Sequence, residues 1–370
     1  MTGALARAAG ATTIDRDGML MADGRRRFFV GLYDLPKVPD AWREAKAAGI
    51  NLVHVAPDAE AFGRAREHGL RAWVSLGSIA AKSRAADEAR IRSVVERFRK
   101  DPALLFWETE DEAAFVWKSR AARVSPEQII ATHDFVRRLD PWRPIYLNHA
   151  PVNLESTLRR YDPGAEIVAA DIYPVIPRGI REMYALWEDG QQGDLLNQTI
   201  SQVGQYTDKM RRVAGPGRAV FMVLQAFAWE DLRQKDRDPK MALYPDREQL
   251  RSMAFQAVVH GAKGLLFWGL ASMPPGAPIW NDLCAVTKEL ADIAPELEAR
   301  PVKLPLRIEY QDTGHSLDRG IEWTARPSRK GITLLCVNAD RNPVEAILHI
   351  PNVKAARVSL APFEAKTIRF

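Results

Sequence analysis

This sequence of 370 residues has little of what marks several common protein classes. It contains 2 cysteines, Cys284 and Cys336, which are far apart and each inside an apolar run; this excludes a disulfide framework and predicts two buried free thiols. No cysteine or histidine pair has the spacing of metal ligands, and no glycine-rich phosphate loop follows an apolar run. We therefore expect no metal and no other cofactor.

Long apolar runs and a strong charge bias are also absent. No stretch approaches the roughly 18 uninterrupted apolar residues of a membrane-spanning helix, and residues 1–13 lack the apolar region of a signal peptide. Lys and Arg number 52 against 47 Asp and Glu, a net charge of +5 with the two signs interspersed. We expect no membrane segment and no nucleic-acid binding. The oligomeric state stays open, and so does the location: secreted or periplasmic if a signal peptide was trimmed, otherwise cytoplasmic.

What the sequence does contain is an alternation of apolar runs and amphipathic segments. Residues 17–35 predict a hairpin that turns at Asp23-Gly24, and its nearly all-apolar second arm is the first of eight expected strands. The expected strands are 28–35, 50–57, 71–78, 103–112, 143–150, 166–175, 218–229 and 262–270. Strands alternating with helices form parallel βαβ units, so eight such units predict the α/β class and a (β/α)8 TIM barrel.

The pattern changes near Arg300, where helical periodicity ends. Six short alternating segments follow, at 304–311, 320–327, 331–338, 344–350, 356–361 and 366–370. They predict antiparallel strands. We therefore expect the barrel, with its N-terminal hairpin, over residues 1–300 and a small β-sandwich domain over 301–370 that braces it.

Carboxylates gather at the end of the fourth expected strand, where a barrel carries its chemistry. The sequence "FWETEDEA" supplies Glu108, Glu110, Asp111 and Glu112. In a regular strand Glu108, Glu110 and Glu112 share one face. Neighbouring carboxylates raise one another's pKa, which is how a general acid stays protonated near neutral pH. The alternative is a solvated acidic loop.

Polar residues also end the next three strands. Asn148 and His149 are suited to binding hydroxyl groups or orienting a carboxylate, or else to capping and packing. Asp171 lies in an apolar strand, which is costly unless the carboxyl is paired or functional. Tyr173 follows it, and Gln225 is embedded in the apolar seventh strand.

Aromatic residues crowd the same strand ends. Trp107, Tyr173, Trp229 and Trp268 close strands, and three more lie in the long loops that follow: Trp187, Tyr244 and Trp280. Aromatic faces stack on the apolar faces of sugar rings, while amides and carboxylates bind hydroxyl groups. Any single Trp is more often part of a core than a ligand platform, but the clustering at one end of the barrel predicts a carbohydrate groove.

These segments resemble the bacterial (β/α)8 glycoside hydrolases. "DGRRRFFVGLYDLP" resembles their opening strand, a motif that ends in Tyr33, and "DPALLFWETEDEA" is similar to their fourth-strand signature W/Y-x-x-x-D-E-P. "AADIYPV", "VLQAFAW" and "VVHGAKGLLFWGL" resemble their sixth to eighth strands. By position, the resemblance implies that Glu112 is the general acid/base and that Asp111 stands beside it.

The sequence departs from this family pattern at two points. The Pro after the D-E pair is Ala113 here, and Gln225 lies near the point where retaining members keep a nucleophilic Glu. Glu230 is close in sequence but lies beyond Trp229. The retaining mechanism with two carboxylates is therefore not secured by the sequence.

Three mechanisms stay open at this point. Glu112 acts as the acid with Asp171 as the base on water, or Asp171 or Glu230 acts as a nucleophile, or the substrate's own acetamido group attacks with help from Asp111 and Glu112. Carboxylate separation decides among them, and a sequence does not contain it.

The leading functional hypothesis is hydrolysis of a glycosidic bond in an oligo- or polysaccharide. The expected catalytic residues are Glu112, Asp111 and Asp171. The expected substrate-binding residues are Tyr33, Trp107, Glu108, Asn148, His149, Tyr173, Gln225, Trp229 and Trp268. The alternative is a non-catalytic carbohydrate-binding barrel, motivated by Gln225. A metal-dependent hydrolase is disfavoured because His54, His149 and His260 are isolated from one another in the sequence.

Overall fold

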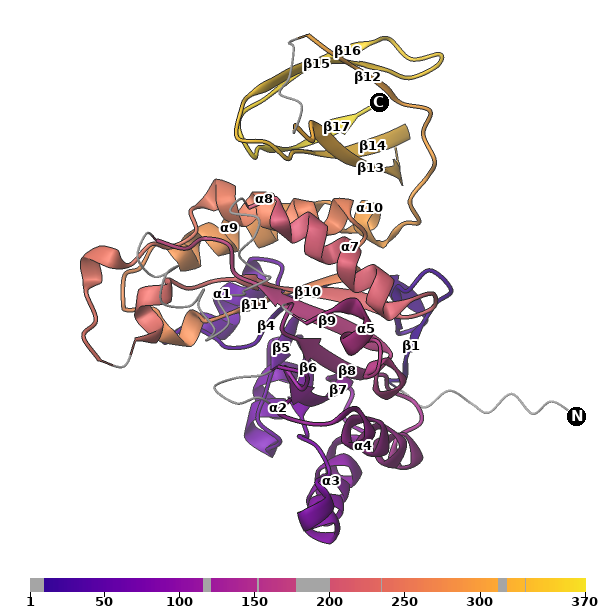
Figure 1. Cartoon of the computed structure of the whole chain (residues 1–370), viewed down its shortest axis with the longest axis vertical. Helices are drawn as coiled ribbons and strands as arrows, with labels where there is room; N and C mark the ends of the chain where they lie inside the picture. The colour runs from indigo at the N-terminus through magenta and orange to yellow at the C-terminus, as the bar shows by residue number, and fades with distance from the viewer. Residues whose placement is uncertain are drawn as a thin grey trace, which may run out of the picture.

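The computed structural model describes residues 10–115, 121–151, 153–177, 200–233, 235–311, 318–329 and 331–370. Its centre is a closed barrel of eight parallel strands in the order β10-β11-β4-β5-β6-β7-β8-β9 (Figure 1). The strands are β4 (Phe29–Leu32), β5 (Leu52–His54), β6 (Arg71–Ser75), β7 (Leu104–Asp111), β8 (Ile145–His149), β9 (Ile167–Ile172), β10 (Ala219–Gln225) and β11 (Gly264–Trp268). Each lies inside one of the expected segments, so the predicted TIM barrel is confirmed.

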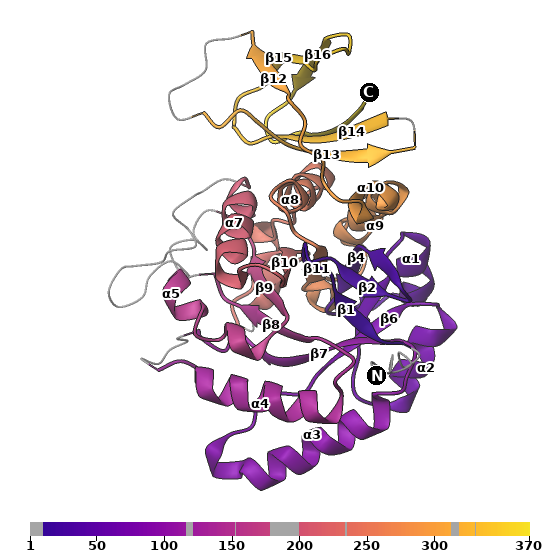
Figure 2. The same ribbon diagram turned by 90° about the vertical axis from the view of Figure 1, so that its right-hand side faces the viewer.

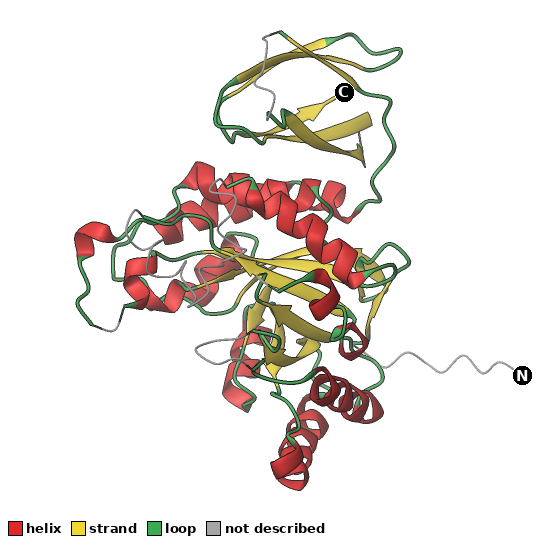
Figure 3. Ribbon diagram, in the orientation of Figure 1, coloured by secondary structure: helices red, strands yellow, loops and turns green. Residues whose placement is uncertain are grey.

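Helices surround this barrel (Figures 2 and 3). They are α1 (Ala41–Ala47), α2 (Ala59–Glu67), α3 (Arg84–Phe98), α4 (Pro126–Leu139), α5 (Glu155–Leu158), α7 (Gln202–Ala214), α8 (Arg247–Val259), α9 (Ile279–Asp292) and α10 (Ala294–Glu298). Ser125 caps α4, and Gln128 completes a capping box with it. No helix in the described ranges is long and apolar enough to cross a bilayer.

A small antiparallel sheet closes the base of the barrel. It contains β1 (Thr12–Ile14), β2 (Leu20–Ala22) and β3 (Arg25–Arg27). The predicted turn at Asp23-Gly24 is confirmed, because both residues have positive φ, as a type I′ turn requires. The expected second arm is wrong in one respect: β3 pairs with β2, and the barrel strand β4 is a separate element that begins at Phe29.

The barrel strands carry two layers of packed side chains, one inside the barrel and one between the strands and the helices. The interior layer includes Phe29, Trp73, Phe106 and Phe221, and Leu20 of the small sheet packs beneath it. Outward-facing side chains of the same strands pack against the helices. The base is therefore closed by packing, and the carboxyl ends of the strands form the mouth in which a site can lie.

After α10 the described chain contains strands and loops only (Figure 3). The strands are β12 (Arg307–Tyr310), β13 (Ile321–Ser328), β14 (Gly331–Asn338), β15 (Val344–His349), β16 (Ala356–Leu360) and β17 (Ala365–Arg369). They form two antiparallel sheets, β12-β15-β16 and β13-β14-β17, around one apolar core. The expected antiparallel β structure is confirmed.

The second of these sheets packs against α8 (Figure 1). Leu335 and Val337 of β14 belong to the same apolar core as the barrel helices, whereas Leu334 and Cys336 on the other face of β14 fill the sandwich. His260, which follows α8, bonds Asp208 of α7 through Nδ1 and Glu322 of β13 through Nε2, both at 2.8 Å. Apolar packing and a partly buried ionic bridge therefore join the two parts.

Candidate active site

A β-bulge in β7 decides which carboxylates enter the barrel mouth. Glu108 pairs in register with Tyr146 and Asp111 pairs with Asn148, so three steps along β7 match two steps along β8. The extra residue turns both Glu108 and Asp111 toward the interior. The prediction that Glu108, Glu110 and Glu112 share one face is therefore wrong.

Glu108 lies at the bottom of the mouth, in the centre of a buried hydrogen-bond network. Its Oε1 accepts from the Tyr33 hydroxyl at 3.1 Å, and its Oε2 accepts from Trp73 Nε1 at 3.0 Å and from the Ser75 hydroxyl. The Tyr33 hydroxyl also bonds that of Tyr146 at 2.8 Å. Burial raises the pKa of Glu108 from 4.5 to about 7, although these donors favour the charged form. Tyr33 and Glu108, both expected to bind substrate, thus lie in contact in the mouth.

Above Glu108, one amide nitrogen links two carboxylates from different strands. Asn148 Nδ2 donates to Asp111 Oδ1 at 2.9 Å and to Asp171 Oδ1 at 3.0 Å. The two oxygens are therefore no further apart than the sum of these bonds. Asn148 Oδ1 is buried without a hydrogen-bond partner, so the site holds an acceptor that a ligand could use.

Glu112 completes this group of carboxyls. Its backbone is in the left-handed region, with φ of 48°, and its N–H donates to the Asn148 carbonyl at 3.1 Å. Burial, the charges of Glu112 and Asp111 and a hydrogen bond with the Glu112 carboxyl raise the pKa of Asp171 well above its usual range. We call Asp111, Glu112 and Asp171 the carboxyl cluster. Burial and the neighbouring charges thus favour the protonated form of Asp171 within this cluster.

Glu112 is the member of the cluster nearest to a positive charge. Arg123 NH1 lies 3.9 Å from its Oε2, and the Glu112 side chain is 23% exposed. Glu110 lies apart and accepts a bond from the Ser78 hydroxyl at 2.9 Å.

Aromatic rings form one wall of the mouth beside the carboxyl cluster. Tyr173 and Trp268 stack with their centroids 5.6 Å apart, and Phe227 stands nearly perpendicular to both at 5.0 Å. Trp229 packs against Phe227 at 5.3 Å. We call these four residues the aromatic wall. After burial, the charge of Asp171 contributes most to raising the pKa of Tyr173, which is consistent with the wall lying next to the cluster.

Gln225 lies at the end of β10, and its amide is used by the backbone. Its Oε1 accepts from Val175 N–H at 2.8 Å, and its Nε2 donates to the carbonyls of Val175 and Phe227 at 2.9 and 3.0 Å. Gln225 therefore fixes the segment that leaves β9. Glu230 accepts from the Asp238 N–H at 2.7 Å, which ties it to its own loop.

Two predicted site residues face away from the mouth. Trp107 is fully buried among helix-facing side chains, and its Nε1 donates to Asp140 at 3.0 Å. His149 is fully buried, and its ring packs edge-on against Tyr161. Burial lowers the pKa of His149 to about 3. The expectation that Trp107 and His149 line the groove is wrong, because both occupy outward positions of their strands.

Two of the three loop aromatics do not add to the aromatic wall. Trp280 is buried and its Nε1 donates to Glu44 at 2.7 Å, and the Tyr244 hydroxyl donates to Asp231. Trp187 lies outside the described residues.

Sequence reasoning missed four residues of the mouth. Trp73, Ser75 and Tyr146 surround Glu108, and Phe227 stands in the aromatic wall. A signal was available, because Tyr146 lies two positions before Asn148 and Phe227 lies two positions after Gln225, so each shares a face with its neighbour. In the described ranges, no group of three or more His, Cys, Asp or Glu residues is arranged to hold a metal ion.

Comparison with known proteins gives a structural likeness only. No family model and no curated protein match the sequence. A solved structure named only as a glycoside hydrolase aligns with a TM-score of 0.61 and 11% identity, over 98% of this chain and 94% of the other. A family 5 glycoside hydrolase from Bacteroides vulgatus aligns with a TM-score of 0.59 and 10% identity, over 98% and 90%.

A β-galactosidase from the psychrophilic Marinomonas ef1 aligns over 75% of this chain and 62% of its own, with a TM-score of 0.53 and 14% identity. Identities this low show the fold and not the activity. The chain thus has the fold of the (β/α)8 glycoside hydrolases, and the resemblance drawn from the sequence is confirmed at that level. The first two alignments also extend over the C-terminal β structure.

Proposed function

We propose that this protein is a glycoside hydrolase that cleaves a glycosidic bond of an oligo- or polysaccharide. One observation carries the proposal: three carboxyl groups gather at the mouth of the barrel, linked by Asn148 and by a hydrogen bond between Asp171 and Glu112, in surroundings that raise the pKa of Asp171 and so favour a shared proton. A proton held near neutral pH is what protonation of a glycosidic oxygen requires. Tyr173, Trp229 and Trp268 of the adjoining aromatic wall are partly exposed and offer ring faces on which a sugar can stack, with the buried Phe227 behind them.

In this proposal Glu112 is the general acid. Its side chain is 23% exposed, so a substrate can reach it, and it shares a hydrogen bond with Asp171. The proton passes to the leaving oxygen as the bond between that oxygen and the anomeric carbon breaks. This step leaves a glycosyl intermediate. Water then attacks the anomeric carbon of that intermediate and gives one of its protons to Glu112, which restores the resting state.

The geometry favours attack by the substrate's own acetamido group over the two other mechanisms. The proposed acid Glu112 shares a hydrogen bond with Asp171, so these two carboxyls lie closer than the roughly 6.5–9.5 Å that leaves room for water in inverting enzymes. Gln225 supplies no nucleophile at the end of β10, and the raised pKa of Asp171 disfavours the ionised form that a nucleophile needs. The proposed substrate is therefore a 2-acetamido sugar, whose amide N–H Asp171 or Asp111 would orient.

A hydrolysis screen tests this proposal. Purified protein is assayed on 4-nitrophenyl glycosides of glucose, galactose, mannose, N-acetylglucosamine and N-acetylgalactosamine, and on oligosaccharides of the same sugars. We expect turnover of acetamido sugars, and we expect Glu112→Gln to lower kcat/KM by about 10²- to 10⁴-fold. Glu60→Gln is the control, because Glu60 is 77% exposed on α2 and lies outside the mouth.

Two results would contradict parts of this proposal. Full activity in Glu112→Gln would remove the general acid assignment. Turnover confined to sugars that lack the acetamido group would leave a glycosidase but exclude the assisted mechanism.

A second candidate is a non-catalytic carbohydrate-binding barrel. It is favoured by Gln225, whose amide is committed to the backbone at the strand end where the related enzymes carry a nucleophile. Absence of turnover on the whole panel, with oligosaccharides still raising the Tm, would support this candidate.

A further inference from the structure

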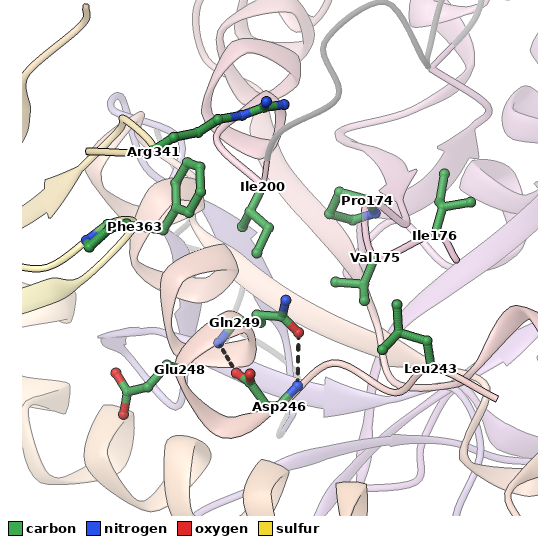
Figure 4. A pocket seen from close by; sticks show the side chains of 11 residues that line it. Pro174, Val175, Ile176, Ile200, Leu243, Asp246, Glu248, Gln249, Arg341 and Phe363 are labelled. Atoms are coloured by element: carbon green, nitrogen blue, oxygen red, sulfur yellow. Dashed lines mark hydrogen bonds between the residues drawn. The ribbon is translucent and has the colours of Figure 1, made fainter. Parts of the chain in front are cut away.

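A cleft of about 480 Å³ separates the exit of β9 from two loops of the C-terminal β structure. Figure 4 shows Arg341 and Phe363 on one side, Val175 and Leu243 on the other, and Ile200 between them. Its volume lies within the roughly 300–1,000 Å³ typical of small-ligand sites. We propose that this cleft is a second binding subsite for the oligosaccharide substrate, to which the β structure contributes Phe363 and Arg341. The ligand class rests on the proposed function.

The cleft is continuous in the chain with the barrel mouth. Pro174 lines the cleft and directly follows Tyr173, whose ring stacks on Trp268 in the aromatic wall. Val175 also lines the cleft, and the Gln225 side chain bonds both the N–H and the carbonyl of Val175. One clamped segment thus forms the side of the mouth and the side of the cleft, so a sugar chain bound in the mouth can extend into the cleft.

The opposite side of the cleft is built from braced loops. The fully buried Asn338 donates from Nδ2 to the carbonyls of Asn342 and Ala361, at 2.7 and 2.9 Å, and so ties both loops together. Phe363 donates its N–H to the Asp340 carbonyl at 3.2 Å. Phe363 has a φ of 58°, which is rare for a bulky residue and persists only where the surroundings enforce it. The loops therefore present its ring in a fixed position.

The two sides hold a fixed relation because the β structure is anchored to the barrel. Leu335 and Val337 pack into the barrel's outer core, and His260 bridges Asp208 and Glu322 across the junction. A cleft between parts that are joined in this way does not depend on a bound ligand to form.

The lining matches a carbohydrate better than a wholly apolar or a highly charged ligand. Phe363, Ile200 and the 44% exposed Leu243 offer apolar surface for ring faces. Arg341 is exposed and makes no ion pair with the residues that the structure describes, so its guanidinium N–H groups are available to hydroxyl oxygens. Glu248 at the start of α8 supplies an acceptor on the same cleft.

The test compares a long and a short substrate in the full chain. The probes are the hexasaccharide and the 4-nitrophenyl monoglycoside of whichever sugar the wild type hydrolyses. Phe363→Ala is expected to lower kcat/KM on the hexasaccharide by about tenfold, mainly through KM, and to leave the monoglycoside within about twofold. Phe363→Tyr keeps the ring and is expected to restore the hexasaccharide value. Val353→Ala, an exposed apolar residue elsewhere in the β structure, is the matched control.

The remaining outcomes distinguish failure of the proposed subsite from failure of the proposed function. Equal losses on both probes, or no loss on either, would overturn the subsite, and a lowered Tm in Phe363→Ala would identify the equal loss as structural. If the wild type hydrolyses nothing, the proposed function fails, and calorimetric binding of chitohexaose, cellohexaose and mannohexaose judges the subsite instead. Binding that weakens in Phe363→Ala supports it; no binding, or unchanged binding, overturns it.

Discussion

Replacing Glu108 by Gln should make the protein more stable at neutral pH and above. The substitution keeps the side-chain volume and removes the buried charge. The network can accept it, because the amide oxygen can take the bonds from Trp73 and Ser75 while the amide NH2 donates to the Tyr33 hydroxyl. Tyr33 can then donate to Tyr146 in place of Glu108, since either hydroxyl of that pair can act as donor.

The size of the effect follows from the pKa of Glu108. Folding raises this pKa from 4.5 to about 7, chiefly through burial. A raised pKa means that the carboxyl's contribution is most favourable below pH 4.5 and is lost as the pH rises through 7. At about 1.4 kcal/mol for each pKa unit, the wild type loses about 3 kcal/mol of unfolding free energy over this range, and the variant does not. Glu108 is buried, so solvent screening does not reduce this value.

Urea denaturation at pH 5 and pH 8 measures the difference. We expect the unfolding free energy of Glu108→Gln relative to wild type to increase by about 2–3 kcal/mol between the two pH values. Glu60→Gln on exposed α2 should show no such increase. A relative stability that is the same at both pH values would refute the reasoning, since it would mean that Glu108 does not titrate in this interval.

Two further predictions concern the junction and the end of β10. Carboxylates on both sides of His260 overcome its burial and raise its pKa from 6.5 to about 9, so the bridge to Asp208 and Glu322 should contribute about 2–3 kcal/mol of stability below pH 6.5. This contribution is lost as the pH rises through 9, so the Tm should fall more between pH 6 and pH 9.5 in wild type than in His260→Gln. Equal falls in Tm would exclude the bridge. Gln225→Glu should lower the unfolding free energy measured by urea denaturation by about 2–4 kcal/mol, because a carboxylate cannot donate to the carbonyls that the Gln225 amide now bonds, such as that of Val175. The variant should not hydrolyse substrate faster than wild type. Increased turnover would contradict the purely structural role of Gln225.

Local pattern was enough to locate the barrel strands and the C-terminal sheets. Apolar runs such as 103–112 and 218–229 alternate with helical segments, and this alternation depends only on neighbouring residues. The rule that strand ends carry the site then selected Asp111, Asp171 and Tyr173, which the structure brings to one mouth.

The residue pattern along the chain was therefore sufficient to predict the order of the elements and the end of the barrel at which polar residues gather. Which side chains enter the mouth depends on contacts that form only in the folded barrel. The bulge in β7 brings Asp111 inward, and the phase of each strand turns Trp107 and His149 outward. Gln225 meets the backbone of Val175, which is 50 residues away in the sequence. The physical reason is that strand phase and register are set by pairing and packing with neighbouring elements, which are distant in the chain.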